Sequence, residues 1–421
     1  MERLAIKGTV KLKGEVKISG AKNASLPILA ATLLTDEPCK ILGVPRLRDV
    51  YTMIRIVEFL GKKAEFHDGT IVVRQHKKLN PVAPYKLVST MRASFCVLGP
   101  ILGRLKLAKV SLPGGCIIGV RPVDLHLKGL TNLGARITIE NGYVVASVKK
   151  CLKGDRIYLG GAFGSSVTGT ANIMMAAVLA QGLTVIEAAA CEPEIADLAQ
   201  FLNKMGAKVE GAGSPIIRIE GVKKLLGAEH CVIPDRIEAG TFMVAAALTQ
   251  GDIVIKNCVP EHLGALIDVL RQAGVSVKIF DNQLRVKMAH RTKPINVTTS
   301  PYPGFPTDMQ AQTMSLAAVT PGISVIHDKI YPDRFMHVAE LNRMGADIQR
   351  QGPYAIVRGV KKLSGAPLMA SDLRASAALV LAGLIAEGKS TISRIYHLDR
   401  GYEKLDAKLR KLGAHIWREQ E

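Results

Sequence analysis

A pattern of a helical segment, a glycine and a short alternating segment recurs six times along the 421 residues of the chain. Successive glycines of this pattern are separated by 73, 72, 68, 71 and 68 residues, a period that indicates a repeated structural unit. Glycine adopts the left-handed conformation that ends many helices at little cost, so each glycine predicts a helix C-terminus followed by a strand. The six glycines are Gly61, Gly134, Gly206, Gly274, Gly345 and Gly413.

A second element, an apolar and alanine-rich segment, recurs in the same phase. These segments are apolar around nearly the whole helix circumference, which predicts buried helices. A more amphipathic helix, such as residues 194–205, is expected before each glycine. We therefore expect an α/β repeat protein whose six units divide three and three into two similar domains. The apolar segments are 26–34, 94–102, 171–180, 240–248, 309–318 and 375–385.

The ends of the chain and of the buried helices give further expectations. Residues 1–20 are expected to form a strand, a turn at Lys13-Gly14 and another strand, and their pattern assigns them to neither half. The chain would cross between the halves at 18–22 and 231–235. The N-terminal ends of the buried helices are polar, and residues 307–310 match a capping box. At equivalent ends of two domains, such N-termini would bind an anion across a cleft, although helix caps alone give the same pattern.

The charge favours an anionic partner, because 56 Lys and Arg stand against 36 Asp and Glu and give a net charge of +20. Dense basic runs and interleaved aromatic residues are absent from the sequence, which argues against nucleic-acid binding. No apolar run reaches membrane-spanning length, and the N-terminus does not resemble a signal peptide. The seven cysteines form no CxxC motif and predict neither disulfides nor a metal site. We expect a cytoplasmic enzyme.

The segment 112–126, LPGGCIIGVRPVDLH, is the most distinctive stretch of the chain. Three glycines between two prolines are typical of a loop, and Cys116 lies near its tip with Arg121 five residues later. An accessible thiol near a cation has the setting of a reactive cysteine, whereas a lone cysteine elsewhere is usually a small buried apolar residue.

Six motifs carry a resemblance to a known enzyme family. In chain order they are GAKNA at 20–24, MRAS at 91–94, the 113–126 loop, FPTDMQ at 305–310, DLRAS at 372–376 and DRGY at 399–402. Together they resemble the UDP-N-acetylglucosamine 1-carboxyvinyltransferases and extend over nearly the whole chain.

The resemblance implies a fold and a reaction. The fold is a two-domain inside-out α/β barrel, the enolpyruvate transferase fold, in which each domain has three units with buried helices and outer sheets. The first domain would comprise 22–232, and the second 1–21 with 233–421. The reaction transfers the enolpyruvyl group of phosphoenolpyruvate to the 3-hydroxyl of UDP-N-acetylglucosamine and releases phosphate, the first committed step of peptidoglycan precursor synthesis. It uses no metal and no cofactor.

The substrates explain why these residue types are needed. Phosphoenolpyruvate carries a phosphate and a carboxylate, and the resemblance assigns it to Lys22, Arg121 and Arg400, with Asn23 beside Lys22. Protonation of C3 makes C2 electrophilic, so a general acid and a general base are required. The resemblance assigns Cys116 as the acid and Asp308 as the base. Proton donation requires the thiol form of Cys116, whereas nearby cations favour the thiolate. The resemblance implies that this thiolate can be alkylated by fosfomycin and can add to phosphoenolpyruvate. Whether Cys116 acts mainly as an acid or as a nucleophile therefore stays open.

The resemblance assigns residues of several motifs to the nucleotide sugar. One of these motifs, at 164–168, departs from the family pattern. In family members this segment usually begins with Lys and ends in Ser-Val-Gly. In this chain Gly164 stands at the lysine position and Thr168 at the glycine position, whereas Ser166 and Val167 match. One cation that faces the diphosphate is therefore expected to be missing or replaced. The residues assigned to the sugar are Arg92, Arg121, Pro122, Val123, Asp124, Leu125, Ser165, Ser166, Val167, Asp308, Ile330 and Arg374.

Two alternative functions are kept. An enolpyruvyl transferase that acts on shikimate 3-phosphate shares the architecture and the phosphoenolpyruvate chemistry, although the Cys116 loop and the context of Lys22 and Asn23 favour the UDP-sugar enzyme. A basic nucleic-acid-binding protein is the alternative from another class, and the scarcity of aromatic residues disfavours it.

Overall fold

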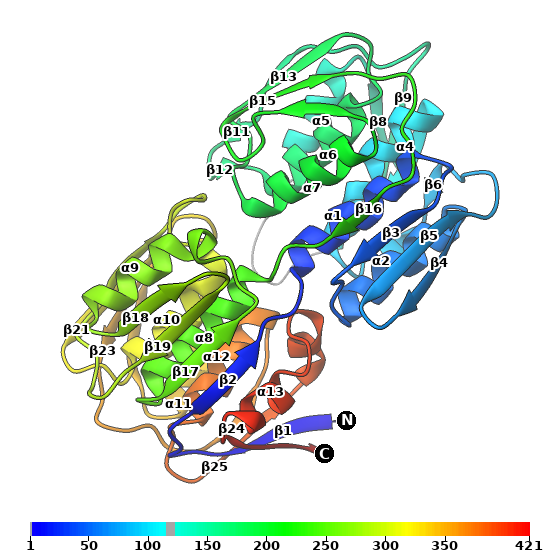
Figure 1. The fold of residues 1–421 in the computed structure, drawn as a ribbon. Helices are drawn as coiled ribbons and strands as arrows, with labels where there is room; N and C mark the ends of the chain where they lie inside the picture. The colour runs from blue at the N-terminus through cyan, green and yellow to red at the C-terminus, as the bar shows by residue number, and fades with distance from the viewer. Residues whose placement is uncertain (1, 115–122) are drawn as a thin grey trace. The chain divides into compact units, whose positions relative to one another are not determined.

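The computed structural model describes residues 2–114 and 123–421. Contacts divide the chain into two compact units. We call residues 2–19 with 234–421 the terminal unit, because it contains both ends of the chain, and the rest of 20–233 the inner unit (Figure 1). Each unit has its own aliphatic core. That these units are folding domains with the limits 22 and 232 stays a prediction.

Each unit contains three four-stranded sheets, and all six sheets have the same design. In the first, β16 (Glu229–Cys231) is parallel to β3 (Cys39–Leu42), which pairs antiparallel with β5 (Thr70–Gln75). The hairpin partner of β5 is β4 (Lys62–His67). A parallel pair at one edge and an antiparallel hairpin at the other thus define the repeated unit, as the sixfold pattern predicts.

The other five sheets follow this order. In the inner unit they are β6 (Val82–Ala83), β7 (Leu107–Ser111), β9 (Tyr143–Ser147) and β8 (Arg136–Glu140), then β10 (Arg156–Tyr158), β13 (Leu183–Glu187), β15 (Ile216–Glu220) and β14 (Lys208–Glu210). In the terminal unit they are β2 (Lys13–Lys17), β17 (Asp252–Lys256), β19 (Gln283–Lys287) and β18 (Ser276–Phe280), then β20 (Asn296–Thr299), β21 (Ile323–Asp328), β23 (Tyr354–Arg358) and β22 (Asp347–Gln351), then β24 (Pro367–Met369), β25 (Lys389–Ser393), β1 (Glu2–Lys7) and β26 (His415–Gln420). A short hairpin of β11 (Gly160–Gly161) and β12 (Gly164–Ser165) lies outside these sheets.

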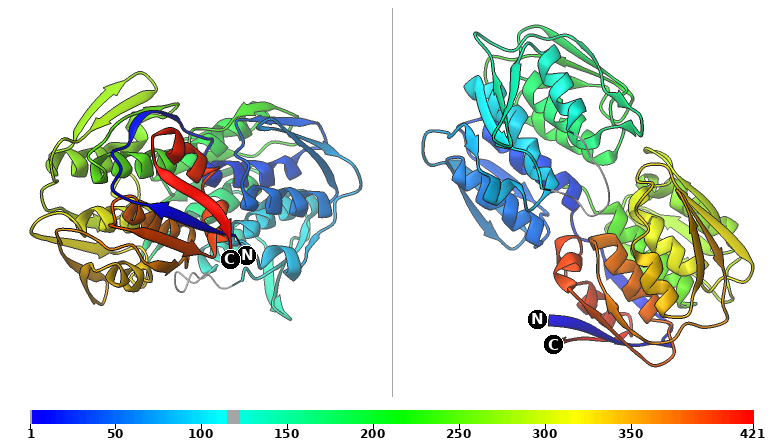
Figure 2. Two further views of the ribbon diagram at one scale, coloured as in Figure 1. Left: turned by 90° about the horizontal axis from the view of Figure 1, so that it is seen from below. Right: turned by 180° about the vertical axis from the view of Figure 1, so that it is seen from behind.

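The first strand of the chain completes the last repeat. β1 takes the place in its sheet that β5 takes in the first, and it pairs with β26 from Glu2 opposite Gln420 to Lys7 opposite His415. The two ends of the chain therefore lie side by side (Figure 2). The expected turn at Lys13-Gly14 is wrong, because both residues belong to β2, which is held parallel to β17.

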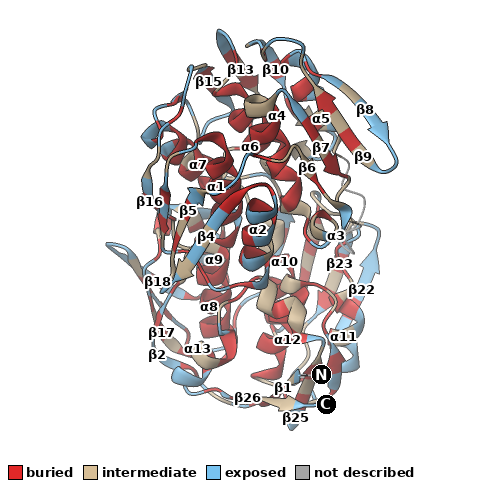
Figure 3. Cartoon of the chain, turned by 90° about the vertical axis from the view of Figure 1, so that its right-hand side faces the viewer, coloured by how far each residue is buried: buried red, intermediate tan, exposed pale blue. Residues whose placement is uncertain are grey.

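The six apolar segments form the helices at the centre of each unit, which confirms their predicted burial (Figure 3). In some of these segments a short 3₁₀ helix directly precedes or follows the α-helix. The inner unit has α1 (Lys22–Ala31) with η1 (Thr32–Leu34), η2 (Arg92–Val97) with α4 (Leu98–Leu105), and α6 (Val167–Ala177). The terminal unit has α8 (Arg236–Leu248), η4 (Thr307–Met309) with α10 (Gln310–Ala317), and α12 (Leu373–Gly383).

Six amphipathic helices precede the periodic glycines, as predicted. All six glycines have positive φ, between 89° and 112°, the region in which a side chain would be strained. The helices are α2 (Arg48–Phe59), α5 (Asp124–Asn132), α7 (Pro193–Lys204), α9 (Gly264–Gln272), α11 (His337–Arg343) and α13 (Leu405–Lys411), and the remaining short helices are α3 (Tyr85–Val88), η3 (Pro260–Leu263) and η5 (Ile395–Arg400).

Two searches of the described ranges bear on the sequence-based expectations. None of the helices within 2–114 and 123–421 combines the length and the apolar character needed to cross a bilayer. In the same ranges, no cluster of three or more His, Cys, Asp or Glu side chains is arranged to hold a metal ion.

Candidate active site

Three of the residues assigned from the sequence, Cys116, Arg121 and Pro122, lie outside the described residues. The others belong to one or the other unit, and each unit is described by itself.

In the inner unit, Lys22 is the first residue of α1, and its side chain is buried against α2. Its Nζ lies 3.3 Å from Oδ2 of Asp49, a buried carboxylate in the first turn of α2. Burying an amine without a counter-charge would be costly, so Asp49 makes the inward position of Lys22 possible. Asn23, the next residue, is exposed.

The residues assigned to the nucleotide lie at the starts of three helices of the inner unit. Arg92 begins η2, Val123 precedes α5, and Asp124 and Leu125 form its first turn. Ser165 ends β12, and the Ser166 side chain caps α6 by accepting a hydrogen bond from the Gly169 amide at 3.1 Å. A Cβ placed on Gly161 would lie 3.1 Å from Cδ1 of Leu125, so the β11–β12 hairpin contacts the start of α5.

Gly164 gives a physical reason for the departure of this chain from the family pattern. Its φ is +97°, a conformation that residues with a Cβ rarely adopt. The tight β11–β12 hairpin therefore requires glycine where the resemblance expects lysine. The chain lacks a lysine side chain at this position because the local backbone conformation favours glycine.

In the terminal unit, Asp308 lies in η4 at the start of α10, and two arginines bind its carboxylate. Arg334 donates from Nη1 to Oδ1 at 2.8 Å, and Arg374 donates from Nε to Oδ2 at 3.1 Å. The Asp308 side chain is 27% exposed, whereas those of Arg334 and Arg374 are 4% and 1% exposed. The carboxylate thus has a buried, cationic side and a side that other molecules can reach.

Both guanidinium groups stay charged despite their burial. Burial alone would lower the pKa of Arg334, but Asp308 and Asp372 outweigh it and raise that pKa. The pKa of Arg374 is raised in the same way, because Tyr402, Asp308 and Asp235 outweigh its burial.

The ring of Tyr402 packs against the guanidinium group of Arg374. The guanidinium carbon of Arg374 lies 5.2 Å from the centre of the Tyr402 ring. Within the described residues the Nη atoms of Arg374 make no hydrogen bond, although Nη2 lies 3.1 Å from Oδ2 of Asp308, and the ring face compensates for part of their desolvation. The Tyr402 hydroxyl lies 2.9 Å from Oγ1 of Thr241 and accepts a hydrogen bond from Gln312 at 3.1 Å. Residues of α8, α10 and the segment after η5 therefore fix Arg374.

Asp328, at the end of β21, joins the segments that carry Asp308 and Ile330. Its Oδ1 accepts the Ile330 amide at 3.0 Å, and its Oδ2 accepts the Thr307 hydroxyl at 2.7 Å. The predicted capping box at 307–310 is wrong, because Thr307 is the first residue of η4 and not its N-cap, and its hydroxyl donates to Asp328 and accepts from Arg334. The amide of the Gln310 side chain is buried and makes no hydrogen bond within the described residues.

The DRGY motif positions Arg400 through its neighbours. Asp399 accepts two hydrogen bonds from Arg418 of β26, at 3.1 and 2.7 Å. A Cβ on Gly401 would lie 2.3 Å from Cδ1 of Leu373, so this segment packs closely against the start of α12. Arg400 is half-buried at the end of η5.

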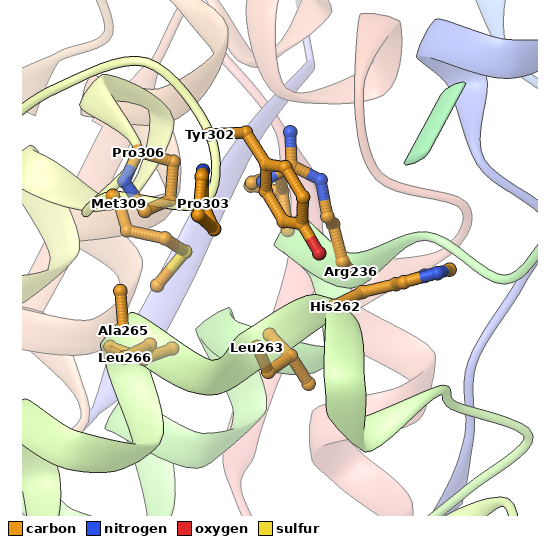
Figure 4. Close-up of a pocket in the computed structure, with 11 residues that line it drawn as sticks. Arg236, His262, Leu263, Ala265, Leu266, Tyr302, Pro303, Pro306 and Met309 are labelled. Carbon is orange, nitrogen blue, oxygen red and sulfur yellow. The ribbon is translucent and has the colours of Figure 1, made fainter. Parts of the chain in front are cut away.

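A small pocket lies next to η4 in the terminal unit. Pro306 and Met309, which flank Thr307 and Asp308 in sequence, line it together with Arg236 and Tyr302. The guanidinium of Arg236 lies 5.4 Å from the centre of the Tyr302 ring, and Figure 4 shows the two side chains next to each other. The pocket has room for about one water molecule, so it does not by itself enclose a ligand.

Sequence reasoning did not find several residues that hold the site. Asp49, Arg334, Asp328 and Tyr402 each contact an assigned residue or its segment across a long sequence separation. Asp49 gives no signal beyond an acidic residue in the first turn of a helix.

Comparisons with known proteins identify the class. The family model described as EPSP synthase (3-phosphoshikimate 1-carboxyvinyltransferase) matches residues 6–409. The chain therefore belongs to this family of carboxyvinyl transferases. Among its relatives, the UDP-N-acetylglucosamine 1-carboxyvinyltransferase of Myxococcus xanthus is 54% identical over 423 residues and covers 100% of both chains. UDP-N-acetylglucosamine 1-carboxyvinyltransferase 1 of Caldanaerobacter subterraneus is 55% identical over 416 residues, 99% of each chain.

Solved structures support the fold. The enolpyruvyl transferase NikO from Streptomyces tendae matches with a TM-score of 0.88 at 24% identity and covers 99% of this chain and 98% of its own. EPSP synthase from Acinetobacter baumannii matches over 100% of both chains with a TM-score of 0.75 at 20% identity. The predicted enolpyruvate transferase fold is confirmed.

Proposed function

We propose that this protein transfers the enolpyruvyl group of phosphoenolpyruvate to the 3-hydroxyl of UDP-N-acetylglucosamine and releases phosphate. The observation that carries the proposal is the 52–55% identity, over 99–100% of the chain, to four relatives that bear the name of this activity. The motifs of the resemblance, including Cys116 and Asp308, are present, except that Gly164 and Thr168 depart from the family pattern.

Asp308 is the proposed base for the sugar hydroxyl. Arg334 bonds to one oxygen of the Asp308 carboxylate and Arg374 to the other, and the side chain is 27% exposed. The two cations weaken the carboxylate as a base but fix its orientation, and proton transfer requires a short, aligned contact. We infer that orientation of the hydroxyl is the larger part of its contribution.

The proposed chemistry has two steps. In the first, the Cys116 thiol gives a proton to C3 of phosphoenolpyruvate, the sugar oxygen forms a bond to C2, and Asp308 takes the hydroxyl proton. In the second, the bond between C2 and the phosphate oxygen breaks, C3 loses a proton, and the double bond re-forms as phosphate leaves. Lys22, Arg121 and Arg400 are proposed to hold the phosphate and carboxylate groups throughout, since fixed cations stabilise charge that develops on the leaving group.

The remaining parts of the proposal concern the setting of the enzyme. We place the reaction in the cytoplasm, at the entry to peptidoglycan precursor synthesis and hence in cell-wall growth and division, with fosfomycin as a covalent inhibitor at Cys116. Arg92, the segment 121–125, Ser165 to Val167, Ile330 and Arg374 are proposed to bind the nucleotide sugar.

A phosphate-release assay with each acceptor tests the proposal. The purified chain is incubated with phosphoenolpyruvate and either UDP-N-acetylglucosamine or shikimate 3-phosphate. We expect release with the UDP-sugar only. Release with shikimate 3-phosphate alone would assign the chain to the other branch of the family. Substitution Cys116→Ser should lower turnover more than sugar binding, and Asp308→Ala should nearly abolish turnover.

A further inference from the structure

The buried His126 and Asn172 side chains bond to each other in the inner unit. Asn172 Nδ2 lies 2.9 Å from His126 Nδ1 and donates to the Phe95 carbonyl at 3.0 Å. Its Oδ1 accepts the Gly99 amide at 2.6 Å. Neither side chain takes part in the proposed chemistry, although His126 directly follows the nucleotide residue Leu125.

The partners of Asn172 determine the proton position on His126. The Gly99 amide can only donate and the Phe95 carbonyl can only accept, so Oδ1 faces the first and the amino group faces the second. The amino group therefore donates to His126 Nδ1, which must be unprotonated. Burial, together with the charge of Arg92, lowers the pKa of His126 to about 3, so the ring is neutral near pH 7 and carries its proton on Nε2.

That proton is directed at Thr168. His126 Nε2 lies 3.2 Å from Oγ1 of Thr168, which therefore accepts and keeps its own hydrogen for another partner. Within residues 2–114 and 123–421, no group accepts this hydrogen. Thr168 is half-buried in the first turn of α6, next to Ser166 and Val167.

The network joins the three helix starts that carry the proposed nucleotide residues. Phe95 belongs to η2, which begins with Arg92; His126 belongs to α5, with Asp124 and Leu125 in its first turn; Asn172 and Thr168 belong to α6. Thr168 also stands where the family pattern has glycine, in the same segment in which Gly164 replaces a lysine. A neutral donor thus appears four residues after the position that lost a cation.

We propose that Thr168 donates its hydroxyl hydrogen to the diphosphate of the nucleotide sugar, and that His126 and Asn172 are positioning residues that hold the hydroxyl in this orientation. The proposal rests on the proposed function, because it takes the UDP-sugar as the ligand. The hydroxyl takes over part of the contact that Gly164 cannot make.

The matched variants Thr168→Val and Thr168→Ser test the contact. Valine has nearly the same shape without the hydroxyl, whereas serine keeps it. One neutral hydrogen bond predicts that Thr168→Val raises the KM for UDP-N-acetylglucosamine and the Kd for UDP by roughly three- to tenfold. We expect Thr168→Ser to stay within about twofold of the wild type, and the KM for phosphoenolpyruvate to be unchanged in both. Wild-type values for Thr168→Val, or equal losses in both variants, would overturn the proposal.

Two substitutions of His126 separate positioning from simple packing. Asparagine can accept from Asn172 but does not reach Thr168, whereas glutamine can place a donor near the position of Nε2. We expect His126→Asn to weaken UDP binding as Thr168→Val does, with no further loss in the double variant. We expect His126→Gln to bind UDP more tightly than His126→Asn. Losses that multiply in the double variant would show that His126 does not act through Thr168.

The outcomes also separate this inference from the proposed function. If the wild type releases no phosphate with UDP-N-acetylglucosamine, the proposed function fails. If the wild type is active and Thr168→Val binds UDP normally, only the inference about Thr168 fails. Melting temperatures of all variants show whether each one is folded when it is assayed.

Discussion

Arg334 and Asp308 form an ion pair between a guanidinium that is 4% exposed and a carboxylate that is 27% exposed, with 2.8 Å between Nη1 and Oδ1. Arg374 binds the other carboxylate oxygen from the same buried side. Because a guanidinium presents planar, paired donors, the two arginines fix the direction of the carboxylate as well as its charge. The exposed edge of Asp308 is thereby aimed outward.

Arg334→Lys should separate charge from orientation. Lysine keeps the cation but offers no planar donor pair, so the Asp308 carboxylate can rotate. Misorientation of a catalytic group predicts a fall in kcat of about 10- to 100-fold, with a smaller change in KM for phosphoenolpyruvate. Steady-state phosphate release measures both constants.

The control for this substitution is Arg285→Lys. Arg285 also binds a carboxylate through two nitrogens, at 2.9 and 2.8 Å to Asp252, but on the exposed face of β19. Its replacement should leave kcat unchanged. An equal loss in both variants would mean that the effect is not specific to the site.

Asp49→Asn tests how Lys22 is kept at its buried position. Removal of the Asp49 carboxylate takes a close counter-charge away from the buried Lys22 ammonium, which predicts a loss of about 3 kcal/mol in the free energy of unfolding. The double variant with Lys22→Met should be more stable than Asp49→Asn alone, because it removes the buried ammonium together with its counter-charge. Urea denaturation of the single and double variants measures the coupling.

The exposed pair of Arg46 and Asp68, 2.8 Å apart, is the control for this prediction. Asp68→Asn should change the free energy of unfolding little, since exposed pairs contribute little. If Asp49→Asn were as mild as Asp68→Asn, the buried pair would not be what holds Lys22.

The features that the sequence predicts well are those that depend on local periodicity. The spacing of Gly61 and its five equivalents, and the apolar segments such as 171–180, follow from backbone conformation and from burial. A repeated unit reinforces each signal six times. The features predicted wrongly are single local motifs. Lys13-Gly14 resembles a turn but pairs with β17, and Thr307 resembles a cap but bonds to Asp328.

The features that the sequence could not predict depend on contacts distant along the chain. Asp49 lies 27 residues from Lys22, and Arg374 lies 66 residues from Asp308. No periodicity connects such partners, because tertiary packing alone brings them together. The conformation of Gly164 is a local property, but it became visible only in its φ of +97°.

Stability should fall on acidification between about pH 6.5 and pH 4. Burial lowers the pKa of His126 to about 3 and that of His337 to about 4, whereas both titrate near 6.5 in the unfolded chain. In this window the unfolded chain binds protons that the folded chain does not, so the free energy of unfolding decreases as pH decreases. Each histidine contributes about 1.4 kcal/mol per pH unit.

Denaturation of the wild type and of His126→Asn at several pH values between 5 and 7 measures this slope. Near pH 5 the free energy of unfolding of the variant should depend less steeply on pH than that of the wild type, because one histidine no longer contributes to the slope. This expectation holds whatever the absolute stability of the variant. Parallel pH profiles for the two proteins would mean that the pKa of His126 is the same in the folded and the unfolded chain.

Gly164→Lys restores the residue type of the family pattern and should nevertheless be unfavourable. At φ of +97° a residue with a Cβ is strained by roughly 1–2 kcal/mol, so the melting temperature should fall. The hairpin of β11 and β12 would have to rearrange before the lysine could reach a diphosphate, and we expect no gain in affinity for UDP. Gly264→Lys is the matched control, because Gly264 has a helical φ and nothing within 4 Å of an added Cβ. A Gly164→Lys variant that is as stable as Gly264→Lys and binds UDP more tightly than the wild type would show that the backbone does not exclude lysine.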